Sequence, residues 1–316
     1  MSNHNRPRIH LLTLLLACLA AALAHADEKS TLPGVKRIVF LGDSITHAGA
    51  YVEDFEAWLV TRLPQRSIEI INVGLPSETV SGLSEEGHAG GKFPRPDLHE
   101  RLDRVLAKTK PDLVIACYGM NCGIYLPFAE ERFQKFADGQ KWLHEKATAA
   151  GAKIIHVTPP VFDENRNHKA GYADTLDRYS DWLLAQRAKG WDVADLHTPM
   201  RRFIGEKRKT DPGFFLADDG IHPGEPGHWL MAQAVLAHIG AKDAAQFADA
   251  KSMLATHPHG AEILGLVQKR QRMMKDAWLT ETGHTRPGMA KGLPLPEAKA
   301  KDAEIEGQIR ELAAAK

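Results

Sequence analysis

Short apolar runs alternate with longer amphipathic stretches through the middle of the chain, between about residues 36 and 240. The apolar runs are rich in Ile and Val and have the length of buried strands. They are residues 36–41, 68–73, 112–118, 153–158 and 191–195. This alternation predicts an α/β domain whose parallel sheet is wrapped by helices.

Apolar positions in the stretches between these strands recur every three to four residues, which is typical of helices with one buried face. In the third stretch Phe136 and Leu143 lie on the same stripe, and Gly151 follows as a helix-ending glycine. The helices are predicted at about 50–63, 97–108, 130–150, 172–189 and 225–240.

The pattern changes after about residue 245, where no further strand is evident. Helical stretches at 246–279 and 296–315 flank a segment rich in Gly and Pro, which is typical of loops. We therefore expect a domain over residues 34–245 and a helical C-terminal extension over 246–316. The last helix either packs on the body or a partner, or forms a solvated tail.

The N-terminus has the pattern of a signal peptide. Two arginines precede an apolar stretch, and Ala24-His25-Ala26 supplies a small-x-small cleavage site. We expect residues 1–26 to be removed and the protein to be exported, to the periplasm or outside the cell. The apolar stretch is shorter than a membrane-spanning helix, which needs about 20 residues. A second interpretation is lipid attachment at Cys18.

Charge and cysteine content narrow the function. Lys and Arg together number 40, as do Asp and Glu, so no net positive charge is available to bind phosphates. Nucleic acid is therefore not an expected partner. Removal of the signal peptide leaves Cys117 and Cys122. An exported protein can form disulfides, but the two lie close in sequence and a bridge demands specific geometry, so we favour two free thiols.

Four short polar motifs lie where strands end or a helix begins. Gly42-Asp43-Ser44 follows the first strand, Asn72-Val73-Gly74 the second and Gly119-Met120-Asn121 the third, and Asp219-Gly220-Ile221-His222 precedes the last core helix. Alone, a serine at a strand end is more often a helix cap than a nucleophile. Because the carboxyl ends of parallel strands share one edge, the four motifs are expected to meet there.

In this order the motifs resemble the SGNH (GDSL-type) esterase and lipase superfamily, over about residues 36–240. The resemblance implies a three-layer α/β/α, flavodoxin-like sandwich with a five-stranded parallel sheet. It also implies a catalytic triad of Ser44, Asp219 and His222. The oxyanion hole would use the backbone N–H groups of Ser44 and Gly74 and the side-chain amide of Asn121.

These roles suit the residue types. Histidine can take the serine proton near neutral pH, and a carboxylate fixes the imidazole and stabilises its charged form. One departure is Cys122, which follows Asn121 where the family usually has Asp. We interpret Cys122 as a small buried filler. No cofactor is expected, and no metal-ligand spacing is found.

His88, Phe93 and Arg95 lie in a loop rich in Gly and Pro after the second strand, and we expect them to line the substrate site; a plain surface loop is the alternative. The expected function is that of an exported serine esterase that removes O-acetyl or other short acyl groups from carbohydrate. A lipase, lysophospholipase or thioesterase of the same superfamily is the alternative. A non-catalytic carbohydrate-binding or scaffold protein is a third interpretation. Oligomeric state is not indicated.

Overall fold

A parallel β-sheet forms the centre of the protein. The computed structural model describes residues 32–315, so the predicted signal peptide (residues 1–26) and Cys18 lie outside the described residues. The sheet has five strands in the order β2-β1-β3-β4-β5, and every pair is parallel. The strands are β1 (Arg37–Gly42), β2 (Glu69–Asn72), β3 (Leu113–Cys117), β4 (Lys153–Val157) and β5 (Asp192–Ala194). The five strands match the predicted runs to within one residue at every end.

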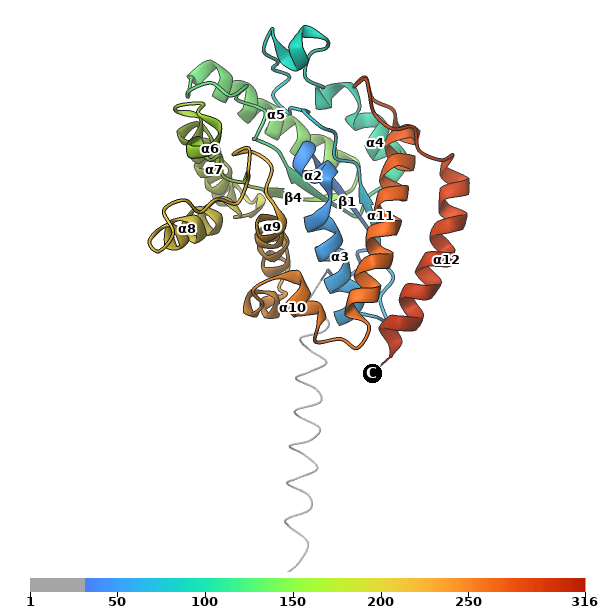
Figure 1. Ribbon diagram of the computed structural model, residues 1–316. Coiled ribbons are helices and arrows are strands. Elements are labelled where there is room, and N and C mark those ends of the chain that lie inside the picture. Colours follow the sequence, from blue (N-terminus) through green and yellow to red (C-terminus); the bar gives the residue numbers. More distant parts are fainter. Residues whose placement is uncertain (1–31, 316) are drawn as a thin grey trace, which may run out of the picture.

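Helices cover both faces of this sheet, as a sheet that is apolar on both faces requires. Figure 1 shows α3, α9 and α11 on one side and α4 and α5 on the other. The helices of the central domain are α2 (Ser44–Ala48), α3 (Ala50–Arg62), α4 (Leu102–Thr109), α5 (Glu130–Ala149), α6 (Glu164–Asn167), α7 (Tyr172–Ala185), α8 (His197–Arg208) and α9 (Glu225–His238). The predicted α/β/α sandwich is confirmed.

Several details differ from the predicted elements. The short helices α2 and α6 were not predicted, and the stretch predicted as helical over 246–279 is interrupted between residues 254 and 260. The segment predicted as one helix over 97–108 is a short 3-10 turn, Leu98–Glu100, followed by α4. Helix α8 was not predicted at all. It buries only His197, Met200 and Ile204, so it lacks a strong apolar stripe, and Pro199 in its first turn resembles a break. Proline is tolerated there because first-turn N–H groups have no partner within the helix.

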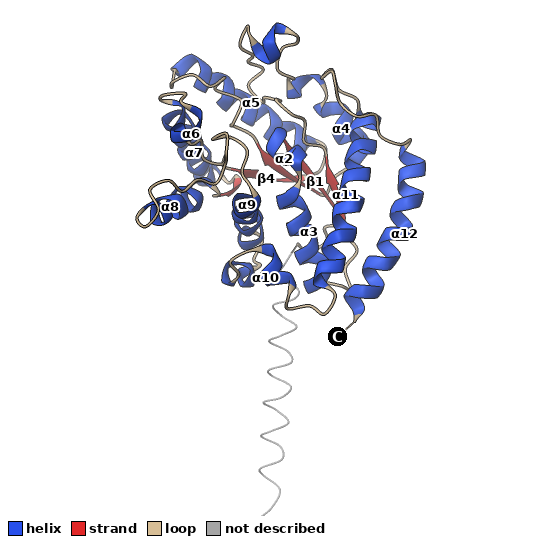
Figure 2. Ribbon diagram, in the orientation of Figure 1, coloured by secondary structure: helices blue, strands red, loops and turns tan. Residues whose placement is uncertain are grey.

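The C-terminal extension forms α10 (Ala250–Leu254), α11 (Gly260–Thr282) and α12 (Leu295–Ala314). Helix α11 packs on α3 and β2, and α12 runs beside α11 on the outer side (Figure 2). Met274, Trp278 and Leu279 of α11 belong to the same apolar core as the sheet. Ile305 and Ile309 of α12 pack with Ile263 and Val267 of α11, so the predicted apolar stripe lies on the body. Of the helices in residues 32–315, none is both long and apolar enough to cross a membrane.

Candidate active site

Ser44 is placed by the end of the central strand β1. The strand stops at Gly42, and the Asp43 carboxylate caps the short helix α2 by accepting a hydrogen bond from the Ile45 N–H at 3.0 Å. Ser44 is the first residue of α2, so its own N–H has no acceptor inside the helix. This N–H can therefore donate to a ligand at the carboxyl edge of the sheet, where the Ser44 side chain also lies.

The structure brings Ser44, His222 and Asp219 together. The Ser44 hydroxyl lies 2.8 Å from His222 Nε2, and His222 Nδ1 lies 2.6 Å from the Asp219 carboxylate. A carboxylate only accepts hydrogen bonds, so Nδ1 carries the proton and donates it to Asp219. In the neutral imidazole this leaves the Nε2 lone pair to accept from the Ser44 hydroxyl. The hydrogen-bond pattern is the one that a general base requires.

Asp219 is held in its ionised form by the residues that follow it. Burial favours the neutral acid, but hydrogen bonds from the His222 backbone N–H, from its ring and from the Ile221 N–H outweigh burial and lower the pKa of Asp219. The two backbone bonds measure 2.8 and 2.9 Å. A carboxylate so held remains charged and fixes the ring opposite it.

The loop that carries Asp219 and His222 is braced by α6. The Asn167 side chain donates to the Asp219 carbonyl at 2.6 Å, and the Asp163 N–H donates to the Gly220 carbonyl at 3.0 Å. Gly220 has φ +76°, and an added Cβ would lie 2.6 Å from the Asp163 carbonyl oxygen. Glycine is thus needed for both the backbone conformation and the close approach. The sequence did not indicate this brace, because α6 is 52 residues away from the atoms that it holds.

Gly74 is packed against α2. An added Cβ would lie 2.5 Å from the His47 nitrogen, so glycine permits the loop after β2 to contact this helix. Its N–H donates to the Asn72 side-chain oxygen at 2.9 Å, and the Asn72 amide donates to the Thr46 carbonyl at 2.7 Å. In this structure the Gly74 N–H therefore already has an acceptor. Its predicted place in the oxyanion hole stays a prediction, and there a substrate oxygen would have to compete with Asn72.

Asn121 is held by its side-chain oxygen, which accepts from Arg95 Nη1 at 2.8 Å and from the Tyr125 hydroxyl at 3.0 Å. Arginine has no acceptor atom, so this contact fixes which end of the amide is oxygen. Among the residues that the structure describes, the opposite end, Nδ2, contacts only the Glu78 carbonyl, at a long 3.5 Å. Asn121 thus has a fixed orientation and hydrogen-bonding capacity left on its amide nitrogen.

Arg95 differs from the prediction that it lines the substrate site. Its side chain is buried, forms two 2.6 Å hydrogen bonds with Glu85, and lies over the Tyr125 ring at 5.2 Å. Its remaining contact is Asn121. The sequence suggested that this arginine lines the substrate site, and in the structure its side chain instead contacts Asn121.

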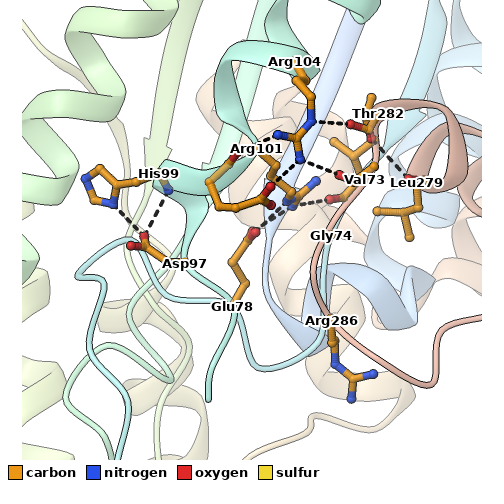
Figure 3. Close-up of polar contacts among 12 residues, drawn as sticks. Val73, Gly74, Glu78, Asp97, His99, Arg101, Arg104, Leu279, Thr282 and Arg286 are labelled. Carbon is orange, nitrogen blue, oxygen red and sulfur yellow. Dashed lines mark hydrogen bonds and ion pairs between the residues drawn. The ribbon is translucent and has the colours of Figure 1, made fainter. Parts of the chain in front are cut away.

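Another ion pair, Arg101–Glu78, lies beside the loop that follows β2 (Figure 3). Arg101 and Glu78 are both fully buried and are joined by hydrogen bonds of 2.6 and 2.7 Å, and the Tyr118 hydroxyl also donates to Glu78. Arg101 also donates to the carbonyl of Val73, the residue before Gly74. This pair ties the loop after β2 to the start of α4. Nothing in the sequence singled out these residues, because their partners are 23 and 28 positions away.

The other predicted positions have simpler surroundings. His88 and Phe93 meet edge to face with ring centres 5.4 Å apart. Cys117 and Cys122 are buried free thiols, and burial raises the pKa of Cys122 to about 12, which suits a filler rather than a nucleophile. Within residues 32–315, no group of three or more His, Cys, Asp or Glu side chains is arranged to hold a metal ion.

Comparisons with known proteins cover the same part of the chain as these motifs. A family model described as GDSL-like Lipase/Acylhydrolase family matches residues 40–230. An acetylxylan esterase from Geobacillus stearothermophilus is 25% identical over 226 residues, which cover 65% of this chain and 94% of that protein. A crystal structure of an acetylxylan esterase from that organism superimposes with a TM-score of 0.51 at 23% identity, with 65% of this chain and 94% of that chain covered.

A gut microbial diltiazem-metabolizing enzyme gives a TM-score of 0.53 at 22% identity. The match covers 67% of this chain and 49% of the other, so this chain spans about half the length of that structure. Both structures share the α/β fold described here.

Proposed function

Because the chain belongs to the GDSL-like lipase/acylhydrolase family and is a hydrolase of ester bonds, we propose that Ser44 is its nucleophile, His222 its general base and Asp219 the carboxylate that orients the base. The observation that carries this proposal is the chain of hydrogen bonds of 2.8 and 2.6 Å from Ser44 through His222 to Asp219. No step that we propose needs a cofactor.

The reaction would proceed through an acyl-enzyme. The Ser44 oxygen attacks the ester carbonyl carbon while His222 Nε2 takes the hydroxyl proton. The resulting oxyanion is stabilised by the Ser44 N–H, the Asn121 amide and the Gly74 N–H if it turns away from Asn72. When the C–O bond breaks, His222 returns the proton to the leaving alcohol. Water, deprotonated by the same imidazole, then attacks the acyl-enzyme carbonyl carbon. When the bond to the Ser44 oxygen breaks, His222 returns that proton to Ser44 and the carboxylic acid is released.

We propose O-acetyl or other short acyl esters on carbohydrate as the substrate. A relative that is 25% identical is an acetylxylan esterase. The side chains of His222 and Asp219 are 49% and 48% exposed, which suits an acyl group displayed on a large polar molecule. The predicted signal peptide favours an exported enzyme, in the periplasm or outside the cell. A preference for long acyl chains would indicate the lipase or lysophospholipase alternative, and activity on thioesters the thioesterase alternative.

The test compares the wild type, the Ser44→Ala variant and, as a matched control, Ser252→Ala in α10, with p-nitrophenyl acetate. We expect Ser44→Ala to lose activity by about 10⁴-fold or more with an unchanged melting temperature, and Ser252→Ala to keep full activity. Equal rates for the wild type and Ser44→Ala would favour a non-catalytic binding protein. Acetate release from acetylated polysaccharides, beside fatty-acyl esters of graded length, identifies the substrate class.

A further inference from the structure

The segment between α11 and α12 lies beside the loop that carries Gly74. Arg286 Nε donates to the carbonyl of Pro76 at 2.9 Å, and Arg104 of α4 donates to the carbonyl of Thr282 at 2.9 Å. Figure 3 shows the segment with Arg286 running next to the loop from Gly74 to Glu78. Because the family match ends at residue 230, this segment is an addition to the family domain that reaches its catalytic region.

Arg286 has no negative partner within residues 32–315. Its hydrogen bonds go to the Pro76 carbonyl, the Pro287 carbonyl and the Met289 sulfur, which are all neutral, and its guanidinium lies 5.4 Å from the centre of the Phe93 ring. Burial lowers the pKa of Arg286, as expected for a partly buried cation without a carboxylate beside it. Such a group gains from an anionic ligand, since part of its desolvation has already occurred.

Three nearby arginines of the same region are neutralised, which makes Arg286 distinct. Arg104 is paired with Glu100. Arg95 is paired with Glu85, and Arg101 with Glu78. Their positive charges are therefore offset within the protein, whereas that of Arg286 is available to a ligand.

Further positive charge lies close to the helix of the nucleophile. Lys275 of α11 donates to the carbonyl of His47, one turn beyond Ser44 in α2, at 2.6 Å. Burial, followed by the charges of Lys275, Arg286 and His284, lowers the pKa of His47 to about 4. Lys275 also has acidic neighbours in Glu53 and Asp276. Arg286 is thus the uncompensated charge in this group.

We propose that Arg286 binds an anionic group of the substrate, so that the natural substrate is an acetylated acidic carbohydrate. The anion is a carboxylate or a sulfate ester carried by the same saccharide as the acetyl group. Among residues 32–315 the Arg286 Nη2 has no acceptor, whereas Nε and Nη1 already donate, so Nη2 can donate to either oxyanion. The half-buried Phe93 ring lies beside it. This inference rests on the proposed esterase function and names its substrate class.

The experiment compares wild type, Arg286→Gln and Arg272→Gln, a matched control with the same charge change on an exposed residue of α11. The substrates are p-nitrophenyl acetate, acetylated xylo-oligosaccharide, acetylated oligogalacturonate and an acetylated sulfated oligosaccharide. For Arg286→Gln we expect kcat/KM to fall about tenfold or more on at least one anionic saccharide, mainly through KM, and less than twofold on the two neutral substrates. Added salt is expected to weaken the wild type on the anionic saccharide and to affect Arg286→Gln much less.

A loss confined to the uronate or to the sulfated substrate supports the inference and identifies the anion. Equal losses on neutral and anionic substrates, or no loss on either anionic substrate, would overturn it. The esterase function is tested separately by Ser44→Ala on p-nitrophenyl acetate. If that variant is inactive while Arg286→Gln behaves as wild type on every substrate, only the assignment of Arg286 is wrong.

Discussion

The catalytic edge of the sheet and the C-terminal extension use charge in opposite ways. At the catalytic edge, His222 and Asp219 are half exposed and the imidazole retains a lone pair toward the Ser44 hydroxyl. In the extension, Arg270 is 7% exposed and is surrounded by carboxylates that neutralise it. The difference lies in the partners: the His222 imidazole keeps a lone pair that can take a proton, whereas the charge of Arg270 is neutralised within the protein.

The buried network of Arg270 explains why the extension is part of the fold. Arg270 of α11 pairs with Glu56 of α3 and Glu306 of α12, and its neighbour Gln271 donates to Glu56 and to the Ile70 carbonyl of β2. A cavity of about 230 Å³ adjoins these side chains at the amino-terminal end of β2. The proposed catalytic residues lie at the carboxyl ends of the strands, so they and the Arg270 network occupy opposite ends of the sheet.

The largest expected effect is on stability. Arg270→Met is expected to lower the free energy of unfolding by about 3–5 kcal/mol, because it leaves the Glu56 carboxylate buried without its partner. Activity at 25 °C should stay within about twofold of wild type. Denaturant unfolding measures the first quantity, and the matched control is Arg310→Met, whose exposed pair with the same Glu306 is worth under about 1 kcal/mol. A loss of activity without a loss of stability would contradict this division of roles.

A substitution at the catalytic edge is expected to do the reverse: it lowers activity and leaves stability nearly unchanged. Asn121→Ala is expected to reduce kcat by about 10²–10³-fold with little change in KM, since an oxyanion donor acts mainly in the transition state. Steady-state kinetics on p-nitrophenyl acetate provide the measurement, and a melting curve shows whether the fold is kept. An unchanged kcat would remove Asn121 from the oxyanion hole.

The next prediction concerns Asp43, the buried carboxyl group beside Ser44, whose ionisation is expected to lower the stability of the fold. Burial raises the pKa of Asp43 to about 6 from an ordinary value near 3.8. A raised carboxyl pKa means that the folded state favours the protonated form, so this group costs stability progressively as the pH rises from about 4 to 6. Asp43→Asn keeps a capping side chain but cannot ionise. Relative to wild type, we expect the variant to gain about 2–3 kcal/mol of unfolding free energy between pH 4 and pH 8. The same difference at both pH values would refute this.

The smallest effect concerns the support of Asn121. Arg95→Met is expected to reduce kcat by about tenfold in the wild-type background, because the Asn121 amide loses the contact that orients it. In the Asn121→Ala background the same change should have almost no further effect on kcat. Kinetics of the two single variants and the double variant measure this coupling. Additive losses would show that Arg95 acts by another route.

The fold could be predicted from the sequence because its strands are continuous apolar runs. Such runs can be identified without knowing which distant segments they pair with. Ser44, Asp219 and His222 could be proposed because each belongs to a short local motif. The same local reasoning missed α8, whose face is weakly apolar, and overlooked that Gly74 meets α2 and the Asn72 side chain. These features depend on contacts between segments that the sequence does not place together.

By itself, the sequence determined the parallel sheet, the resemblance that selects an esterase, and the residue types available at the carboxyl edge. Only the tertiary structure decided that Arg95 contacts Asn121, and that Arg286 of the extension reaches the loop of Gly74 with no carboxylate partner among residues 32–315. Apolar periodicity is a property of neighbours along the chain. Charge compensation depends on the three-dimensional distances between groups, and those distances exist only after folding.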